Sequence, residues 1–251
     1  MNKLILFIFL LISCSSNDNK KNIPTFDGNN AYQYIVEQCN FGPRNPGSKG
    51  HKEFAIFLEK YLLEFTKNVT VQDFNYIEHI TGVERRGKNI IAQFNIDAEN
   101  RLLIGAHWDT RAFSDEDSDE KNRPLPILGA NDGASGTSVL MELAKIFSQN
   151  NPPMGIDLVF FDAEDVGISG KPKTYAMGSE YFSKNLPIKK PKNAIIVDMV
   201  GDKYLQIPIE RFSYQINPKL VKEIWSLADE LNLSAFEYRI GYEIYDDHVP
   251  L

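Results

Sequence analysis

Cysteine is scarce in this chain, because its 251 residues include only two, Cys14 and Cys39. Cys14 is expected to be modified, for reasons given below, which would leave Cys39 without a partner for an internal disulfide. No histidine lies close to Cys39 in the sequence, so we interpret it as a small core or helix residue and not as a nucleophile. Cysteine chemistry is therefore not expected to carry the function.

An excess of positive charge is also absent, since 27 Lys and Arg residues stand against 34 Asp and Glu, a formal net charge of −7. Binding to a nucleic-acid backbone needs cations that release counterions from phosphate, so we expect no nucleic-acid partner. The chain is nevertheless 43% hydrophobic, with 16 Phe and 11 Tyr. This composition can bury a substantial core and argues against disorder.

The apolar run at the start of the chain, residues 4–12, is too short to span a bilayer as a mature helix. Lys3 precedes it and Ser13-Cys14 ends it, a pattern that resembles the lipobox of bacterial lipoproteins, in which the cysteine is acylated. We expect residues 1–13 to be a signal peptide and residues 14–28 to be a tether lipidated at Cys14. The protein would then be an exported bacterial lipoprotein, membrane-anchored and either periplasmic or at the cell surface. The alternative is an ordinary signal peptide with an incidental cysteine.

Helix-like and strand-like segments follow one another beyond residue 29. Apolar residues at helical spacing predict helices over residues 30–40, 48–65, 136–149, 179–185 and 218–231. Runs of β-branched, aromatic or continuous apolar residues predict strands over 69–76, 88–95, 101–106, 157–161 and 194–200. Near-continuous apolar strands separated by helices are typical of a largely parallel sheet covered on both faces. With no internal repeat and no linker, residues 29–251 are expected to form one domain.

Polar residues stand at the carboxyl ends of these strands. His107 follows one strand, Glu164 and Asp165 follow another, and Asp198 lies in the last. Asp132 lies in a glycine-rich segment that leads into a predicted helix. Ligands collect at this edge of an open α/β sheet, although a single Asp after a strand is often only a helix N-cap.

Several carboxylates in one cleft would raise each other's pKa values unless a divalent cation neutralised them. Carboxylate and imidazole ligands without a thiolate suit catalytic zinc and fit a closed structural zinc site poorly. We therefore interpret the clusters as a metal site and not as a set of helix caps. The adjacent acids at 164 and 165 can divide the work, one binding metal while the other moves a proton.

Other polar residues lack such a pattern. His51 and His79 have no evident partner in the sequence and are expected on the surface or in loops. The acidic segment 115–120 could bind calcium, but it lacks the glycine turn and the glutamate spacing that such loops need, so a solvated loop is favoured.

Several short segments carry a family resemblance when they are taken together. They are Gly105-Ala106-His107-Trp108-Asp109, the segment from Gly129 to Gly136, Phe160-Phe161-Asp162-Ala163-Glu164-Asp165, Gly178-Ser179-Glu180-Tyr181-Phe182 and Val197-Asp198. In order and spacing, from about residue 30 to the end, they resemble the zinc aminopeptidase clan. Within that clan, segments 107–111 and 246–250 most resemble animal-type glutaminyl cyclases in their bacterial form. The resemblance implies a three-layer α/β/α fold with a mostly parallel, mixed central sheet.

The resemblance also implies a role for each matching residue. Asp132 and Asp165 would be zinc ligands, and Glu164 would be the catalytic residue that transfers a proton. Asp198 and Asp247 would form a hydrogen-bonded pair of catalytic carboxylates. His107 matches a histidine that binds a second metal in the aminopeptidases and only lines the site in the cyclases.

The chain departs from the family pattern at two places. The family's last zinc ligand is a histidine that would fall beyond Leu251, so we expect the C-terminal part of the catalytic domain to be missing from this sequence. His248 follows the matching catalytic Asp and is not expected to be a ligand. The animal cyclases also have a Trp soon after the acidic pair, where this chain has Gly170 or Tyr175.

The resemblance leaves three functions open. The favoured one is a glutaminyl-peptide cyclotransferase with one zinc ion, which converts the N-terminal glutamine of peptides or proteins to pyroglutamate and releases ammonia. The second is a two-zinc aminopeptidase, in which His107 and Asp198 hold one ion and Asp132 bridges both. The third is a lipid-anchored binding protein without activity. The expected partners are peptide or protein N-termini and, through Cys14, a membrane.

Overall fold

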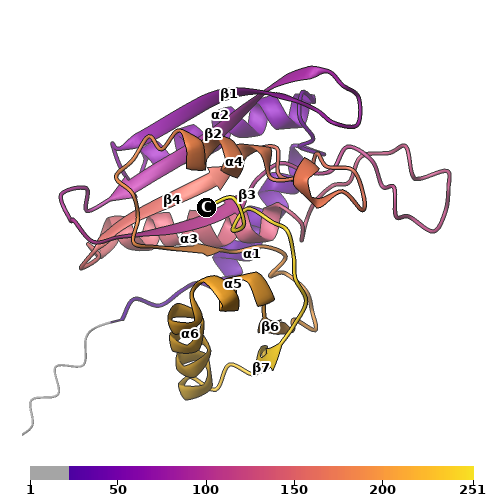
Figure 1. Ribbon diagram of the computed structural model, residues 1–251. Coiled ribbons are helices and arrows are strands. Elements are labelled where there is room, and N and C mark those ends of the chain that lie inside the picture. The colour runs from indigo at the N-terminus through magenta and orange to yellow at the C-terminus, as the bar shows by residue number, and fades with distance from the viewer. Residues whose placement is uncertain (1–22) are drawn as a thin grey trace, which may run out of the picture.

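The computed structural model describes residues 23–251 and shows one main sheet with helices around it (Figure 1). The expected signal peptide at 1–13, the lipidation site Cys14 and the tether up to residue 22 lie outside the described residues. Within residues 23–251, no helix combines the length and the apolar character that crossing a membrane requires.

The main sheet is mixed, as predicted. Its five strands are β1 (Val69–Ile77), β2 (Glu84–Phe94), β3 (Arg101–His107), β4 (Gly155–Phe161) and β5 (Asn193–Ile196), in the order β1-β2-β4-β3-β5. Strand β3 pairs in parallel with β4 and with β5, whereas β2 is antiparallel to both of its neighbours. The single reversed strand, β2, therefore separates β1 from three parallel strands. All seven residues of β4 are buried, as expected for a continuous apolar strand near the centre of a sheet.

Helices cover both faces of this sheet and complete the three layers. Helices α1 (Gly28–Asn40), α2 (Lys49–Leu63) and α3 (Ala134–Gln149) lie on one face, and α4 (Met177–Lys184) lies on the other. Successive residues of a strand point to opposite faces. Leu158 and Phe160 accordingly pack in the core with α2 and α3, while Val159 and Phe161 pack with Phe182 of α4.

A small unit that the sequence did not predict follows β5. The strands β6 (Ile207–Ile209) and β7 (Phe236–Ile240) pair in parallel as a separate two-stranded sheet. Helices α5 (Arg211–Ile216) and α6 (Pro218–Glu230) connect them, and Figure 1 shows the unit beside the main sheet. Strands of three and five residues are too short to stand out from sequence alone, which is why only the second helix was expected.

Two strand boundaries differ clearly from the prediction. Strand β2 begins at Glu84 and not at residue 88, because the β1–β2 hairpin continues to its turn. Strand β5 ends at Ile196 and not at residue 200. Met199 has a positive φ of 49°, so the chain turns there and places Asp198 beyond the strand end.

Candidate metal centre

Three adjacent strands end at the same edge of the sheet and deliver most of the predicted site. His107 is the last residue of β3, which lies between β4 and β5. Glu164 and Asp165 follow β4, Asp198 follows β5, and Asp132 lies in the loop just before α3. This meeting of strand ends is the arrangement that binds ligands in open α/β sheets.

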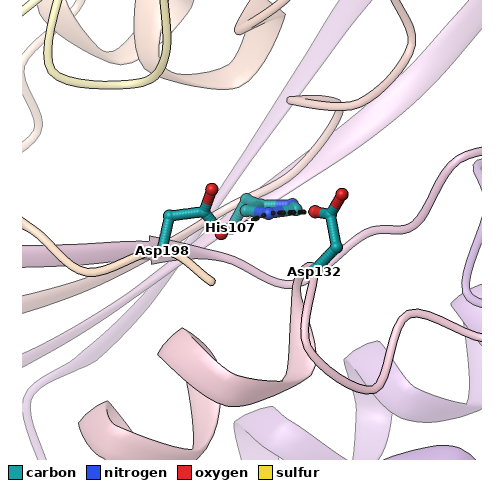
Figure 2. Close-up of side chains that lie close together, drawn as sticks. All are labelled: His107, Asp132 and Asp198. Carbon is teal, nitrogen blue, oxygen red and sulfur yellow. Dashed lines mark hydrogen bonds and ion pairs between the residues drawn. The ribbon is translucent and has the colours of Figure 1, made fainter. Parts of the chain in front are cut away.

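His107, Asp132 and Asp198 point toward one another (Figure 2). His107 Nε2 lies 3.0 Å from Asp132 Oδ1 and 3.2 Å from Asp198 Oδ1, and one ligand atom from each residue falls within 4.8 Å of the others. The imidazole is 2% exposed, whereas the two carboxylates are 36% and 26% exposed. The group therefore has a buried base and an open side.

The pKa values of His107 and Asp132 reflect how strongly the side chains of this group interact. Burial disfavours a charged His107, but hydrogen bonds to the surrounding carboxylates outweigh burial and raise its pKa well above the usual value. Burial likewise opposes ionisation of Asp132, yet the hydrogen bond from His107 lowers the pKa of that carboxyl. The single positive charge of a protonated His107 offsets only part of the two negative charges of Asp132 and Asp198, so the group keeps a net negative charge that favours a metal ion.

Asp109 holds the acidic loop after β4 in place. Its Oδ1 accepts a hydrogen bond from the backbone N–H of Glu164 at 3.0 Å, and its Oδ2 accepts one from Asp165 at 3.2 Å. Asp109 Oδ1 also lies 3.5 Å from Nδ1 of His107, on the opposite side of the ring from Asp132. A carboxylate behind the histidine is the support that metal-binding imidazoles commonly have. The sequence placed Asp109 in the motif but did not reveal this role.

Asp165 lies beside a different partner. Arg111 Nη1 donates to its Oδ1 at 3.1 Å, and Arg111 also binds Asp115 through Nε and Nη2 at 2.6 and 2.5 Å. Burial and the nearby Asp132 raise the pKa of Asp165 to about 8, although Arg111 opposes this rise. Arg111 binds the carbonyl oxygen and Oδ1 of Asp165, and within residues 23–251 it makes no hydrogen bond to Oδ2, which is the carboxylate oxygen that could face a metal ion.

Glu164 and Asp247 are both buried among acids. Burial, followed by the charges of Asp246 and Asp247, raises the pKa of Glu164 well above its usual range. Burial and Asp246 do the same for Asp247, whose two carboxylate oxygens have no hydrogen-bond partner within residues 23–251. The expected hydrogen bond between Asp198 and Asp247 is absent from this part of the chain, because Asp198 contacts His107 instead.

His248 lies away from the proposed ligands. Its Nε2 is 3.2 Å from Oε2 of Glu210, the residue that caps α5. The other oxygen of Glu210 accepts a hydrogen bond from the N–H of Ile244 at 3.2 Å. Glu210 therefore holds the segment that carries Asp247, and His248 serves this contact.

Arg44 supports the loop that carries Asp132, a role that sequence reasoning missed. Its guanidinium is fully buried and donates to the carbonyl oxygens of Trp108 at 3.1 Å, Leu128 at 3.2 Å and Gly129 at 2.9 Å. Burial lowers its pKa to about 10, which still leaves it protonated at neutral pH. A single buried cation thus ties the end of β3 to the loop that carries Asp132.

The expectation that His51 lies on the surface is wrong. His51 is buried, its Nε2 lies 2.9 Å from Asp162 Oδ1, and its ring stacks on Trp108 with centroids 4.5 Å apart. A usable signal was present, because position 51 lies on the same helical face as Phe54 and Leu58. His79, in contrast, is exposed as expected.

The residues of this centre fit a divalent cation. Four features agree: clustered carboxylates, an imidazole supported by Asp109, buried acids with raised pKa values, and two carboxylate oxygens of Asp247 without partners. A nearby dication would reverse the pKa shifts of these acids, because it stabilises their ionised forms. The donor set of oxygen and nitrogen without sulfur is the kind found at catalytic zinc.

Comparison with known families decides the family. The model of peptidase family M28 matches residues 89–251, which include every residue proposed for the site. The chain belongs to peptidase family M28.

Solved structures of this M28 chain's relatives share its fold closely. A glutaminyl cyclase of Bacteroides thetaiotaomicron, solved with N-acetylhistamine bound, is 36% identical with a TM-score of 0.88, over 91% of this chain and 81% of that one. A Zn-dependent exopeptidase of Parabacteroides distasonis is 33% identical with a TM-score of 0.87, over 91% and 80%. Membership of family M28 and the likeness to the Zn-dependent exopeptidase support zinc as the metal of this protein.

Curated relatives match over a shorter part. A glutaminyl-peptide cyclotransferase-like protein of Bos taurus is 25% identical over 148 residues, which is 56% of this chain and 37% of that protein. The chain thus spans well under half the length of the first curated relatives it matches.

Proposed function

We propose that this M28 protein is a zinc-dependent glutaminyl-peptide cyclotransferase. One observation carries the proposal. Asp109 accepts a hydrogen bond from the backbone N–H of Glu164, and this fixes the loop that carries the buried Glu164 carboxyl at the edge of the sheet where His107, Asp132 and Asp198 also meet. The likeness to the glutaminyl cyclase of Bacteroides thetaiotaomicron supports this reaction over others of the family.

The chain offers ligands for zinc in two overlapping sets. Asp132 and Asp165 would hold the single zinc ion of a cyclase. His107 and Asp198 would be ligands of a second zinc ion, if one binds. When bound, zinc supplies Lewis acidity, which makes the amide carbon of the substrate easier to attack. We propose one zinc ion for the cyclase, and the fold is compatible with either one ion or two.

Glu164 would move the proton in this reaction. The α-amine of the substrate's N-terminal glutamine forms a bond to its own side-chain carbonyl carbon, and the bond from that carbon to the side-chain nitrogen breaks. Glu164 takes a proton from the attacking amine and gives it to the departing nitrogen, which leaves as ammonia. Burial raises the pKa of Glu164, and bound zinc would lower it again, so the two opposed effects leave a carboxyl that can accept a proton and return it.

Asp198 and Asp247 would assist from the other side of the site. Their negative charges attract the positive charge that develops on the attacking amine. The attack is intramolecular, so most of the rate enhancement must come from holding the glutamine side chain folded back on its own amine.

A two-zinc aminopeptidase is the second candidate, and one observation favours it. His107, Asp132 and Asp198 already lie close enough to share one ion. In that case Glu164 would remove a proton from water, and a peptide bond would be cleaved. The likeness to the Zn-dependent exopeptidase of Parabacteroides distasonis supports this alternative.

Two peptides separate these functions. One begins with glutamine and the other with leucine, and both are otherwise identical. The cyclase predicts ammonia and a product lighter by one ammonia from the glutamine peptide, with the leucine peptide unchanged. Free amino acids from either peptide, without pyroglutamate, would overturn the cyclase. Two zinc ions per chain in elemental analysis would support the aminopeptidase.

We also propose that the protein is attached to a membrane through lipid on Cys14. The support is the sequence around Cys14, with Lys3 and an apolar run before it and a polar tether after it. Acyl chains on Cys14 would anchor the domain at a bacterial membrane, with peptide N-termini as its substrates. The Cys14→Ser variant should appear in the soluble fraction after cell lysis. Continued membrane association of that variant would contradict the proposal.

A further inference from the structure

A groove lies beside the candidate centre and is not used by the reaction just described. It has a volume of about 660 Å³, within the range of small-ligand clefts. Three separate segments form it: the turn between β1 and β2, the loop 112–128 and the loop that follows Asp165. Its lining consists of Ile80, Phe113, Asp115, Arg123, Pro124, Ile168 and Ser169. Figure 1 shows these segments projecting from the same end of the main sheet.

The groove continues directly from the acidic loop of the site. Ile168 comes three residues after the proposed ligand Asp165. Arg111 lies between the two regions, because one side of its guanidinium binds Asp165 and the other binds the groove residue Asp115. The site and the groove are thus separated by the width of one guanidinium group. A peptide extending from the site over Arg111 would enter the groove within its first few residues.

Hydrogen bonds hold the walls of the groove in shape. Ser169 Oγ donates to Glu116 Oε1 at 2.8 Å and joins two of the three segments. Within the loop 112–128, the N–H and the hydroxyl of Ser114 both donate to the carbonyl oxygen of Leu125, at 2.8 and 2.9 Å. A groove that is already formed binds a side chain without first ordering a loop, which favours affinity.

The lining indicates the kind of side chain that fits. Four of the lining residues are apolar, namely Ile80, Phe113, Pro124 and Ile168. The two charged lining residues already have partners among the described residues, because Asp115 binds Arg111 and Arg123 lies 3.5 Å from Glu120. An apolar side chain placed in the groove would be removed from water, which is favourable. Ile80 is 40% exposed, so part of its side chain is open to a ligand.

We infer that this groove is a specificity site for the substrate, and that it binds an apolar side chain two to four positions along the peptide. The inference rests on the proposed cyclase function and adds the substrate class to it. The N-terminal glutamine would occupy the metal centre while a Leu or Phe shortly after it lies on Ile80, Phe113 and Ile168. Peptides with only small residues after glutamine would lose this contact.

Tetrapeptide amides test the inference. The reference is Gln-Gly-Gly-Gly-amide, and three partners carry Leu at position 2, 3 or 4. Ammonia release gives kcat/KM for each peptide. We expect Leu at one of the three positions to raise kcat/KM by roughly 10-fold over the reference, the effect of burying one such side chain.

Two variants with the same substitution locate the effect. Ile80→Ser should reduce the ratio of kcat/KM for the Leu peptide over the Gly peptide to near one. Ile56→Ser, on the exposed side of α2 at 69% exposure, should leave that ratio unchanged. Both residues are solvent-exposed in part, so neither change is expected to prevent folding.

The outcomes distinguish the inference from the function on which it rests. Ammonia release with equal kcat/KM for all four peptides would contradict the role of the groove and would leave the proposed cyclase function intact. A Leu preference that is unchanged in Ile80→Ser would show that the preference does not come from the groove. No ammonia from any of the peptides would overturn the proposed function and the inference with it.

Discussion

Replacing Asp109 by Asn tests how the acidic loop is held. The side chain of Asp109 is fully buried and accepts the backbone N–H groups of Glu164 and Asp165 with its two oxygens. Asn has the same shape but only one acceptor oxygen, so one of the two N–H groups must face an NH₂ group instead. The loop that carries both residues would then be held at one point and not at two.

Two effects of opposite sign set the magnitude. The unpaired buried N–H destabilises the fold by about 1–3 kcal/mol, and exchanging a charged acceptor for a neutral one at the other N–H adds about 1 kcal/mol. Against this, the change removes one negative charge near Asp165, whose pKa Asp109 helps to raise. That relief matters mainly without metal, because a bound dication already neutralises the cluster. With zinc we therefore expect a net loss of about 2–4 kcal/mol, and a smaller loss without it.

Thermal unfolding with zinc and with a chelator measures both states. For a domain of this size the loss with zinc corresponds to a fall in Tm of roughly 10 °C, and the fall with chelator should be smaller. Asp73→Asn is the matched control, because Asp73 is 68% exposed and its one ion pair, with Lys88, is long at 3.7 Å. A wild-type Tm and wild-type kcat for Asp109→Asn in zinc would refute the role of Asp109. An equal fall in both conditions would refute the electrostatic half of the reasoning.

Three further predictions concern single residues. Glu164→Gln should lower kcat by about 100-fold or more while zinc content stays at the wild-type level, and retained turnover would show that another group moves the proton. Gly136→Ala should destabilise the protein by about 3 kcal/mol in urea unfolding, because its Cβ would lie 2.0 Å from a carbonyl oxygen just past β5, whereas Gly28→Ala meets nothing within 4 Å and should be neutral. The ion pair with Asp162 outweighs burial and raises the pKa of His51. The stabilisation that His51 provides is therefore complete below its unfolded pKa of about 6.5, and it is lost as pH rises through the folded pKa. The free energy of unfolding should therefore fall from pH 6 to 8 in the wild type more steeply than in His51→Gln, and equal slopes would contradict this account.

Local signals in the sequence account for most helices and strands. Helix α2 has apolar residues at helical spacing, and it begins at the residue after Ser48, whose side chain accepts the N–H of His51 at 3.0 Å. Strand β4 is a continuous apolar run and is buried at every residue. Short strands such as β6 have no such signal, because three residues cannot display a period.

The candidate site was only partly visible in the sequence. Residues at strand ends could be named, because ligands collect at this edge of an α/β sheet and several acidic residues at neighbouring strand ends are more than helix capping requires. Supporting residues could not be named in the same way. Arg44 acts through carbonyl oxygens of distant loops, and backbone acceptors leave no trace in a sequence.

The sequence by itself determined most of the longer helices and strands, and which side chains stand at their ends, because helical spacing, capping and apolar runs act over a few neighbouring residues. Only the tertiary structure decided which of those side chains meet. The strand order places β3 between β4 and β5, and this brings His107 to within 3.2 Å of Asp198 across 91 positions of sequence. The tertiary structure also pairs Asp165 with Arg111, and it buries His51 in contact with Asp162. These contacts follow from how strands pair and helices pack across the whole chain, which no local pattern of residues specifies.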